Sequence, residues 1–310
     1  MQIVTAQQIR AVLDWTGVLD ALRDGHAGAR PIGDSYFVGD AGFGLFSRGV
    51  ILPGKGAGFK VASLCPANQS ASPPRPTEQS AFLVVDEHSR SIVAMLDGPE
   101  ITRWKTAADS ALAATKLSRE DSEVLLVLGA GPVALALAEA YLHIRPSLRE
   151  VLLWNRTLSK VDAMRVALES RSIRVRVVED LDEAVARADI VTAATGASLP
   201  VIRGERVRPG THVDLVGGYR PDMQEADCDA LKGARIFVDD RENASVSGDI
   251  LIPMQAQIIH AGQIEADLFE LCQDTAFHRD ASDRTVFKNA GGAYLDLLVS
   301  QYVVERLRSC

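Results

Sequence analysis

Short apolar runs alternate with helical segments between residues 123 and 241 of the chain. The runs are EVLLVLG, EVLLWN, IRVRVVED, DIVTAAT, THVDLVGG and ARIFVDD, and the segments with helical spacing of apolar residues are PVALALAEAYLHI, LSKVDAMRVALESR and LDEAVARA. Strands that alternate with helices are typical of a doubly wound parallel sheet. We therefore expect an α/β fold with a Rossmann-type sheet.

The N-terminal third of the chain has a different pattern. Thr5 is an N-cap candidate for two short helices, which we expect to be interrupted at Gly17. Between Arg30 and Asp97, short β-like runs separated by Gly, Pro and Ser predict a mainly antiparallel sheet. The Pro- and Ser-rich segment 65–79 predicts a long loop without regular structure.

Two further helices complete the expected organisation. Residues 98–121 have the alanine and leucine content of a helix, and AGGAYLDLLVSQYVVERLRS near the C-terminus predicts a long helix that packs back on the first domain. At 310 residues the chain exceeds the usual size of one domain. We expect an α+β domain of residues 1–117 with 290–310, and an α/β domain of residues 118–289.

Composition and charge narrow the classes of ligand. The formal net charge is −8 and the basic residues are scattered, which disfavours nucleic acid and anionic membranes as partners. The cysteines form no CxxC pair and the histidines have no metal-ligand spacing, so we expect reduced thiols and no metal. Without a signal-peptide pattern or a run of about 20 apolar residues, we expect a cytoplasmic protein that binds a small molecule.

The motif GAGPVA lies between the first strand of the α/β region and the helix that follows it. It fits GxGxxA: Gly129 permits a tight turn, Gly131 allows the backbone to approach a pyrophosphate, and Ala134 lets the helix lie close to the sheet. The helix start at Pro132 and Val133 then offers free N–H groups and the positive end of the helix dipole. A dinucleotide is the expected ligand.

The end of the second strand indicates which dinucleotide is preferred. An NAD site usually has an acidic residue there, which holds the ribose 2′-hydroxyl. This chain has Asn155, Arg156 and Thr157, with Lys160 close behind, and these side chains suit a 2′-phosphate. We therefore expect NADP(H) to be preferred, with NAD(H) possible.

Several motifs together resemble the ornithine cyclodeaminase and mu-crystallin family over nearly the whole chain. They are DGPEITRWKTAADSALAATKLSRED, LGAGPVA, WNRT, VGGYRPDMQEAD, SGDIL and TVFKNAGGAYLD, in this order. The resemblance implies a homodimer with a nicotinamide-binding Rossmann domain and a second domain for substrate binding and dimerisation. Its members include ornithine cyclodeaminases, alanine dehydrogenases, reductases of cyclic ketimines and NADPH-binding mu-crystallins.

The resemblance also implies roles for residues outside the glycine motif. Arg30 and Lys60 are similar to the family's substrate-side cations, and a positive clamp suits an α-carboxylate. Thr77 and Gln79 fall where the family contacts cofactor and substrate. The remaining cofactor positions implied are Thr106, Thr195, Val216, Gly217 and Asn289.

The chain departs from the family pattern at two positions. Lys105 replaces the usual arginine, which keeps the charge for a substrate carboxylate but loses the bidentate fork. Tyr219 stands where ornithine cyclodeaminases have a catalytic aspartate, and a tyrosine with its ordinary pKa of about 10 is a poor base at neutral pH, although it can bind the substrate by donating a hydrogen bond. Asp222 is three residues further on and would have to move to replace that aspartate.

These departures favour ketimine reduction, which needs only a hydride and one proton, over deaminating cyclisation. We expect an NAD(P)-dependent oxidoreductase that reduces a cyclic ketimine such as pyrroline-2-carboxylate, or oxidises a small amino acid, with Lys60 as the proton donor or ordered water in its place. One alternative is an ornithine cyclodeaminase in which Asp222 acts as the acid and base. Another is a non-catalytic, NADPH-dependent binding protein of the crystallin type.

Overall fold

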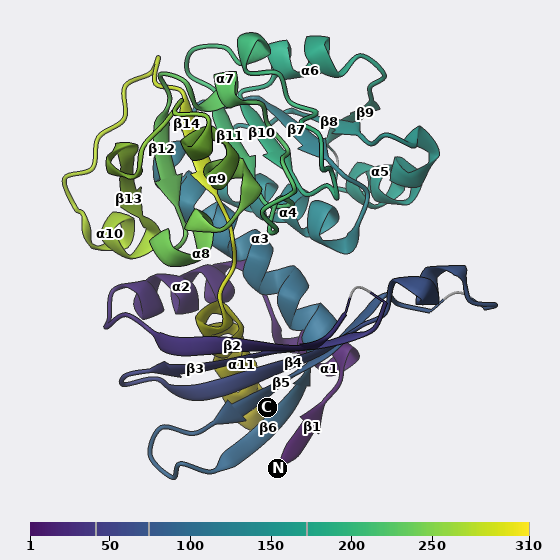
Figure 1. Ribbon diagram of the computed structural model, residues 1–310, viewed down its shortest axis with the longest axis vertical. Coiled ribbons are helices and arrows are strands. Elements are labelled where there is room, and N and C mark those ends of the chain that lie inside the picture. Colours follow the sequence, from purple (N-terminus) through teal and green to yellow (C-terminus); the bar gives the residue numbers. More distant parts are fainter. Residues whose placement is uncertain (41, 74, 172, 310) are drawn as a thin grey trace. The chain divides into compact units, whose positions relative to one another are not determined.

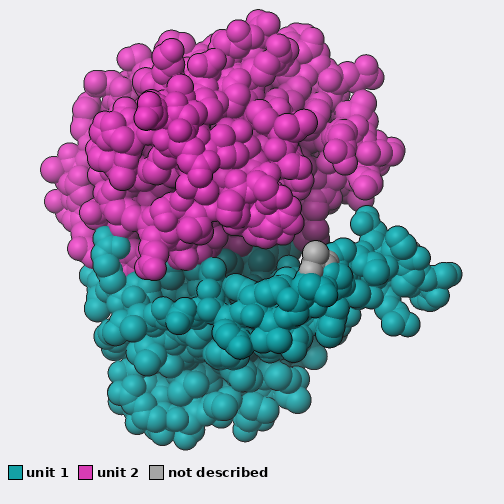
Figure 2. All heavy atoms as spheres, in the orientation of Figure 1, with its two compact units in different colours: residues 1–105, 292–310 teal, residues 106–291 magenta. Residues whose placement is uncertain are grey.

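The computed structural model describes residues 1–40, 42–73, 75–171 and 173–309. It contains two compact units, which Figure 2 shows in different colours. Unit 1 comprises residues 1–105 and 292–310, and unit 2 comprises residues 106–291. Along the chain, the first boundary falls inside the helix α3 (Gly98–Leu117). Each unit has a sheet of its own.

Unit 1 is built on a six-stranded sheet within the part of the chain that the structure describes. Its strands are β1 (Gln2–Val4), β2 (Ile32–Gly39), β3 (Gly44–Leu52), β4 (Gly56–Leu64), β5 (Glu78–Val85) and β6 (Ile92–Asp97), in the order β1-β6-β5-β4-β3-β2. β2 to β6 pair antiparallel with their neighbours in sequence, whereas β1 joins β6 in parallel. The mainly antiparallel sheet predicted for this region is confirmed.

Capping residues decide where the first helices, α1 (Ala6–Val12) and α2 (Trp15–His26), begin. The predicted N-cap is confirmed: the Thr5 hydroxyl accepts the N–H of Gln8, and the Gln8 side chain accepts the N–H of Thr5. The prediction of a break at Gly17 is wrong. The carboxylate of Asp14 accepts the N–H of Gly17 at 2.8 Å, so the second helix already begins at Trp15.

Two other predicted boundaries need correction. The segment expected to lack regular structure contains a 3₁₀ helix at Pro66–Ser70, where proline occupies the first helical position. The helix predicted for residues 98–121 ends at Leu117. Its last carbonyl groups are satisfied by Arg145, whose guanidinium donates to the backbone oxygens of Ala114 and Thr115.

The C-terminal helix α11 (Ala293–Arg308) belongs to unit 1. It packs on α2 and on the sheet at β3, β4 and β5 (Figure 1). Its buried residues include Leu295, Asp296 and Leu298. The packing therefore brings an acidic side chain from the end of the chain onto the sheet.

The two faces of β4 have different surroundings. Lys60 and its cross-strand partner Phe82 point to the face that α11 covers, and Phe82 is fully buried. The neighbouring side chains Phe59 and Val61 point to the other face, because side chains alternate along a strand. Both are exposed. The sheet thus holds Lys60 inward and an apolar row outward.

Unit 2 contains an eight-stranded parallel sheet within the described residues. Its strands are β7 (Val124–Leu128), β8 (Glu150–Trp154), β9 (Arg174–Val177), β10 (Ile190–Ala193), β11 (His212–Leu215), β12 (Arg235–Val238), β13 (Ile264–Asp267) and β14 (Thr285–Lys288), in the order β13-β12-β14-β11-β10-β7-β8-β9. The order runs outward from β7 through β8 and β9 on one side and through β10 and β11 on the other, as in a doubly wound sheet, and β14 is inserted between β11 and β12. The predicted fold class is confirmed.

Helices connect most of these strands (Figure 1). They are α4 (Pro132–Ile144), α5 (Asp162–Glu169), α6 (Leu181–Arg187), α7 (Cys228–Leu231), α8 (Arg241–Ser245), α9 (Gly248–Gln255) and α10 (Leu268–Gln273), with 3₁₀ turns at Leu158–Val161, Gly204–Arg206 and Ala261–Gln263. β13 and β14 were not predicted from the sequence. Among the described residues, no helix has the length and apolarity that a membrane crossing requires.

Candidate nucleotide and substrate sites

The motif GAGPVA forms the turn from β7 to α4. Gly129 has φ +118°, which L side chains rarely adopt, and a Cβ there would lie 2.5 Å from the carbonyl oxygen of Ala194. Ala134, in the first turn of α4, is fully buried against the sheet. Only glycine at position 129 lets the chain turn this closely beside the end of β10.

The space beyond the turn suits a phosphate. Gly131 is the N-cap of α4, and a Cβ built on it would meet no atom within 4 Å among the described residues. Pro132 begins the helix without an N–H, so Val133 carries the first free backbone donor. The small side chains at this helix start leave its N–H groups accessible to an anion. These residues fit a dinucleotide pyrophosphate.

A cavity of about 410 Å³ lies at the carboxyl ends of β7, β8 and β10. Ligands of parallel α/β sheets bind at this edge. The residues that line it are Gly129, Ala130, Gly131, Trp154, Asn155, Arg156, Thr157, Lys160, Ala194, Thr195, Gly196, Ala197 and Val201. The structure therefore brings together the glycine motif, the four polar residues after β8 and Thr195.

The loop after β8 carries two positively charged side chains that are exposed to solvent. The Asn155 amide donates to the carbonyl oxygen of Thr157 at 2.8 Å, which holds the loop in a turn. Arg156 and Lys160 are exposed. No described residue that lines this cavity carries a carboxylate. The charge around the cavity is therefore positive.

Glu225, which was not among the residues predicted from the sequence, connects the loops that follow β10 and β11. One carboxylate oxygen accepts the N–H and the hydroxyl of Thr195, both at 2.7 Å, and the other accepts the N–H of Gly217 at 2.6 Å. Val216, before Gly217, directly follows the last residue of β11. The sequence signal of Glu225 is weak, because it lies in the acidic stretch MQEAD, which looks like an exposed loop.

The residues at the end of β14 are buried. Lys288 and Asp249 are fully buried and form an ion pair at 3.0 Å. The Asn289 amide nitrogen donates to the carbonyl oxygen of Thr106 and to the hydroxyl of Ser110, both at 3.0 Å. Asn289 and Thr106, both predicted to contact the cofactor, thus also contact each other inside unit 2.

Two lysines of unit 1 converge on Asp296. The Lys60 ammonium donates to the Thr102 hydroxyl at 2.7 Å and to one Asp296 oxygen at 3.2 Å. The Lys105 ammonium lies 3.8 Å from the other oxygen of the same carboxylate. The side chains of Lys105 and Asp296 are 8% and 2% exposed, so these charges meet in a mostly dry setting.

Three other predicted residues of unit 1 lie at its surface. Arg30 is exposed just before β2. Thr77 and Gln79 are exposed at the start of β5, where the Thr77 carbonyl oxygen accepts the N–H of Cys65 at 2.8 Å. That bond closes the segment between β4 and β5 as a loop.

The loop after β11 directs its polar side chains to solvent. Tyr219 is 64% exposed. The Asp222 carboxylate accepts two hydrogen bonds of 2.8 Å from Arg220 and is 65% exposed. These hydrogen bonds lower the pKa of Asp222. An acid held in this way stays ionised, which does not suit it to donate a proton at neutral pH.

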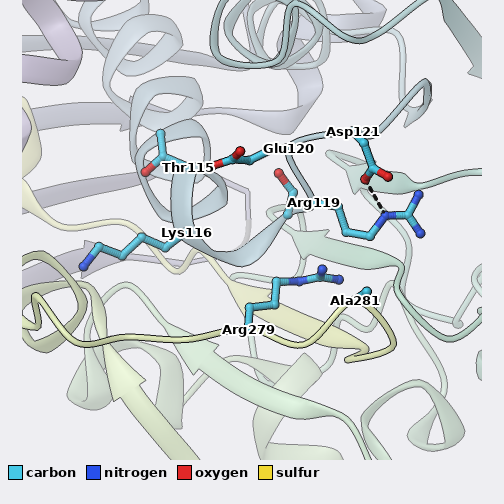
Figure 3. Close-up of a pocket in the computed structure, with 8 residues that line it drawn as sticks. Thr115, Lys116, Arg119, Glu120, Asp121, Arg279 and Ala281 are labelled. Carbon is cyan, nitrogen blue, oxygen red and sulfur yellow. Dashed lines mark hydrogen bonds and ion pairs between the residues drawn. The ribbon is translucent and has the colours of Figure 1, made fainter.

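A second hollow of unit 2, of about 420 Å³, lies at the C-terminal end of α3 (Figure 3). Its cations contact oxygens of the chain itself. Arg119 pairs with Asp121 and Asp189, and Arg279 donates to the carbonyl oxygens of Leu117 and Gly210. These contacts join segments at the amino edge of the sheet, opposite the edge where such folds bind ligands. We assign the hollow a structural role.

The comparisons with known proteins agree with this geometry. The family model for the ornithine cyclodeaminase/mu-crystallin family matches residues 52–310. A Delta(1)-pyrroline-2-carboxylate reductase of Paracoccus denitrificans is 39% identical over 94% of this chain and 92% of its own length. The ketimine reductase mu-crystallin of Rattus norvegicus is 34% identical over 74% of this chain and 70% of its own length.

A solved structure has the same fold along the whole chain. The Delta(1)-pyrroline-2-carboxylate reductase of Thermococcus litoralis, in complex with NADH and L-proline, superimposes with a TM-score of 0.93 at 24% identity. The match covers 100% of this chain and 98% of that protein. From the family model and the sequence relatives together, the chain belongs to the ornithine cyclodeaminase/mu-crystallin family.

Proposed function

We propose that this protein is an NAD(P)H-dependent ketimine reductase that converts a cyclic imine of the pyrroline-2-carboxylate type to the corresponding cyclic amino acid. The observation that carries the proposal is the Lys60–Asp296–Lys105 cluster. Two lysine ammonium groups lie beside one carboxylate there, and lysine ammonium groups suit the carboxylate of a substrate. The family relationship and the reductase activity of the relatives support the same reaction class.

The nucleotide cavity of unit 2 supplies the second requirement of a reductase. We assign the pyrophosphate to the helix start after Gly129, where Gly131 leaves open space and Val133 offers a free N–H. Arg156 and Lys160 line the cavity and are exposed, which supports binding of a 2′-phosphate, and the described cavity lining lacks the carboxylate that would repel one. We therefore propose NADPH as the preferred cofactor.

Reduction of a ketimine requires two things from the protein: a positive charge that binds the substrate carboxylate, and a group that donates one proton. A bound reduced nicotinamide supplies the hydride for the imine carbon. Lys105 attracts the substrate carboxylate. Lys60, held by Thr102 and Asp296, is the group that we assign to donate a proton to the nitrogen. Asp222 has no part in this reaction, since its carboxylate is exposed and bound by Arg220.

The outer face of the unit 1 sheet supports a dimer. The strand register places seven apolar side chains on this face, all of them exposed: Ile32, Tyr36, Val38, Leu45, Ile51, Phe59 and Val61. A hollow of about 630 Å³ runs across β2, β3 and β4 on the same unit. Contiguous apolar patches of this kind mark protein interfaces. We propose that a second copy of the chain covers this face.

The test is to follow NADPH and NADH absorbance with pyrroline-2-carboxylate and piperideine-2-carboxylate, and to assay ammonia release from ornithine with NAD⁺. The proposal expects nicotinamide oxidation with a ketimine and no ammonia from ornithine. Ammonia and proline from ornithine would indicate a cyclodeaminase instead. NADPH binding without turnover of either substrate would indicate a binding protein.

A further inference from the structure

The carboxylate of Glu225 joins two neighbouring loops at the edge of the sheet where the nucleotide cavity lies. Thr195, which follows β10 and lines the cavity, donates two hydrogen bonds of 2.7 Å to it. Gly217, which follows β11, donates a third at 2.6 Å. β10 and β11 are adjacent parallel strands, so this single side chain sets the spacing between the ends of both.

The backbone of Glu225 is bound by a buried ion pair between Asp249 and Lys288. The backbone N–H of Glu225 donates to one oxygen of Asp249 at 2.7 Å, and the other oxygen of Asp249 is 3.0 Å from the Lys288 ammonium. All three residues are fully buried. Lys288 ends β14, which pairs with β11. The network therefore extends across the ends of three adjacent strands.

The loops held by this network approach each other closely. A Cβ on Gly217 would lie 2.0 Å from the carbonyl oxygen of Thr195, and one on Gly218 would lie 2.2 Å from a carboxylate oxygen of Asp249. Side chains cannot fill this space, so hydrogen bonds to the carboxylates must fix the loops.

We propose that Glu225 is a positioning residue for the cofactor: its ionised carboxylate orients Thr195 and Gly217 at the nucleotide cavity. Because the Thr195 hydroxyl donates its hydrogen bond to Glu225, its oxygen can act only as an acceptor for a ligand in the cavity, which suits a ligand hydroxyl such as that of a ribose. The inference rests on the proposed function in so far as the cavity binds a dinucleotide.

The charge of Glu225 is sensitive to pH near neutrality. Burial and the nearby Asp249 raise its pKa to about 7, while Lys288 and the donors of Thr195 act in the opposite direction. The charged groups that face it are Asp249 from α9 and Lys288 from β14. Protonation turns one acceptor oxygen into a donor that faces other donors, so the ionised form is the one that orders the loops.

The raised pKa of Glu225 makes the stability of the fold and the affinity for the cofactor change in opposite directions with pH. A carboxyl group with a raised pKa in the folded state stabilises the fold below its ordinary pKa, and this contribution is lost as the pH rises through the folded value. Lowering the pH from 8 to 6 therefore strengthens the fold through Glu225. The same change weakens cofactor binding, because the competent, ionised form becomes scarce.

The experiment compares Glu225→Gln with Glu150→Gln in the full chain, using NADH fluorescence to measure Kd. NADH is the probe because it lacks the 2′-phosphate, which titrates near pH 6 itself. Glu150 is a suitable control, since it is also buried but begins β8 and pairs with Arg176 and Arg187. The glutamine amide at position 225 has only one oxygen, so its NH₂ group must face a hydrogen-bond donor of either Gly217 or Thr195. We expect Kd for NADH to rise about tenfold to a hundredfold in Glu225→Gln, and less than threefold in the control.

A second measurement does not depend on the variant folding well. In the wild type we expect Kd for NADH to rise about tenfold between pH 8 and pH 6, while the Glu150→Gln control keeps the same profile. A wild-type Kd that is independent of pH, or an unchanged Kd in Glu225→Gln, overturns the assignment of Glu225. Binding without ketimine turnover overturns the reductase proposal alone, and absence of NADH and NADPH binding to the wild type overturns both.

Discussion

Lys60 and Asp296 are 236 positions apart in the sequence, yet the Lys60 ammonium donates to the Asp296 carboxylate at 3.2 Å. Their side chains are 12% and 2% exposed. Lys60 comes from a central strand of a mainly antiparallel sheet, and Asp296 comes from the first turn of the C-terminal helix. The contact makes the end of the chain part of the proposed substrate site.

Asp296→Asn leaves two buried ammonium groups without their shared carboxylate. We expect the free energy of unfolding in urea to fall by about 3 kcal/mol, as for other buried pairs that lose one partner. Asp20→Asn is the control, because the Asp20 side chain is 56% exposed and pairs with Arg23 at the surface. It should change stability by less than about 0.5 kcal/mol. Equal effects of the two variants would contradict the role of Asp296.

The two lysines of the cluster are predicted to affect different kinetic constants. Lys105→Gln should raise KM for the ketimine about tenfold, because a charged hydrogen bond to the carboxylate is lost. Lys60→Met should lower kcat about a hundredfold, as expected for a lost general acid. Steady-state kinetics with the exposed Lys55→Met as a control separates the two roles. A change in KM alone in Lys60→Met would argue for ordered water as the proton donor.

Asn155→Asp tests the cofactor preference. A carboxylate at the end of β8 repels a 2′-phosphate, so kcat/KM with NADPH should fall about tenfold to a hundredfold. The value with NADH should change less than threefold, because its ribose hydroxyl can donate to the new acid. The same substitution at Asn243, which does not line the cavity, provides the control. If both cofactors respond equally, the positive residues after β8 do not select the phosphate.

Phe59→Glu tests the proposed dimer face. Phe59 is 42% exposed on the outer face of β4, so a charge there should block association without disturbing the core. Sedimentation equilibrium should show a dimer for the wild type and a monomer for the variant. Val166→Glu is a matched change, since Val166 is 60% exposed on α5 of unit 2. A dimer that survives Phe59→Glu would place the interface elsewhere.

His212 is predicted to destabilise the fold in acid. Burial, Arg279 and Arg145 lower its pKa to about 3, and it contacts the Thr285 hydroxyl at 2.9 Å. Because the unfolded chain binds a proton near pH 6.5, the contribution of neutral His212 is present above that pH and is lost as the pH falls toward 3. Each pH unit in this range is worth at most about 1.4 kcal/mol.

The measurement is urea unfolding at pH 7, 5 and 4 for the wild type and His212→Gln. The glutamine should reduce the loss of stability on acidification. His278→Gln, at a side chain that is 81% exposed, should leave the acid dependence as it is in the wild type. Identical pH dependences for His212→Gln and the wild type would contradict the role of the buried histidine.

Local chemistry explains why the sequence alone determined so much of this protein. The turn at Gly129, the capping box at Thr5 and the alternation of strands and helices in unit 2 all depend on residues close together in the chain. The same holds for the positive loop after β8, because the strand and its polar end are contiguous. Periodicity and spacing report such features directly.

The tertiary structure decided which distant charges meet. Asp296 neutralises Lys60, and Lys288 pairs with Asp249, only because α11 and β14 return to sheets formed by earlier segments. Glu225 looks like an exposed loop acid in the sequence, whereas folding buries it against Thr195 and Gly217. Burial and the partner of a charge depend on the packing of distant segments, and no local pattern records either one.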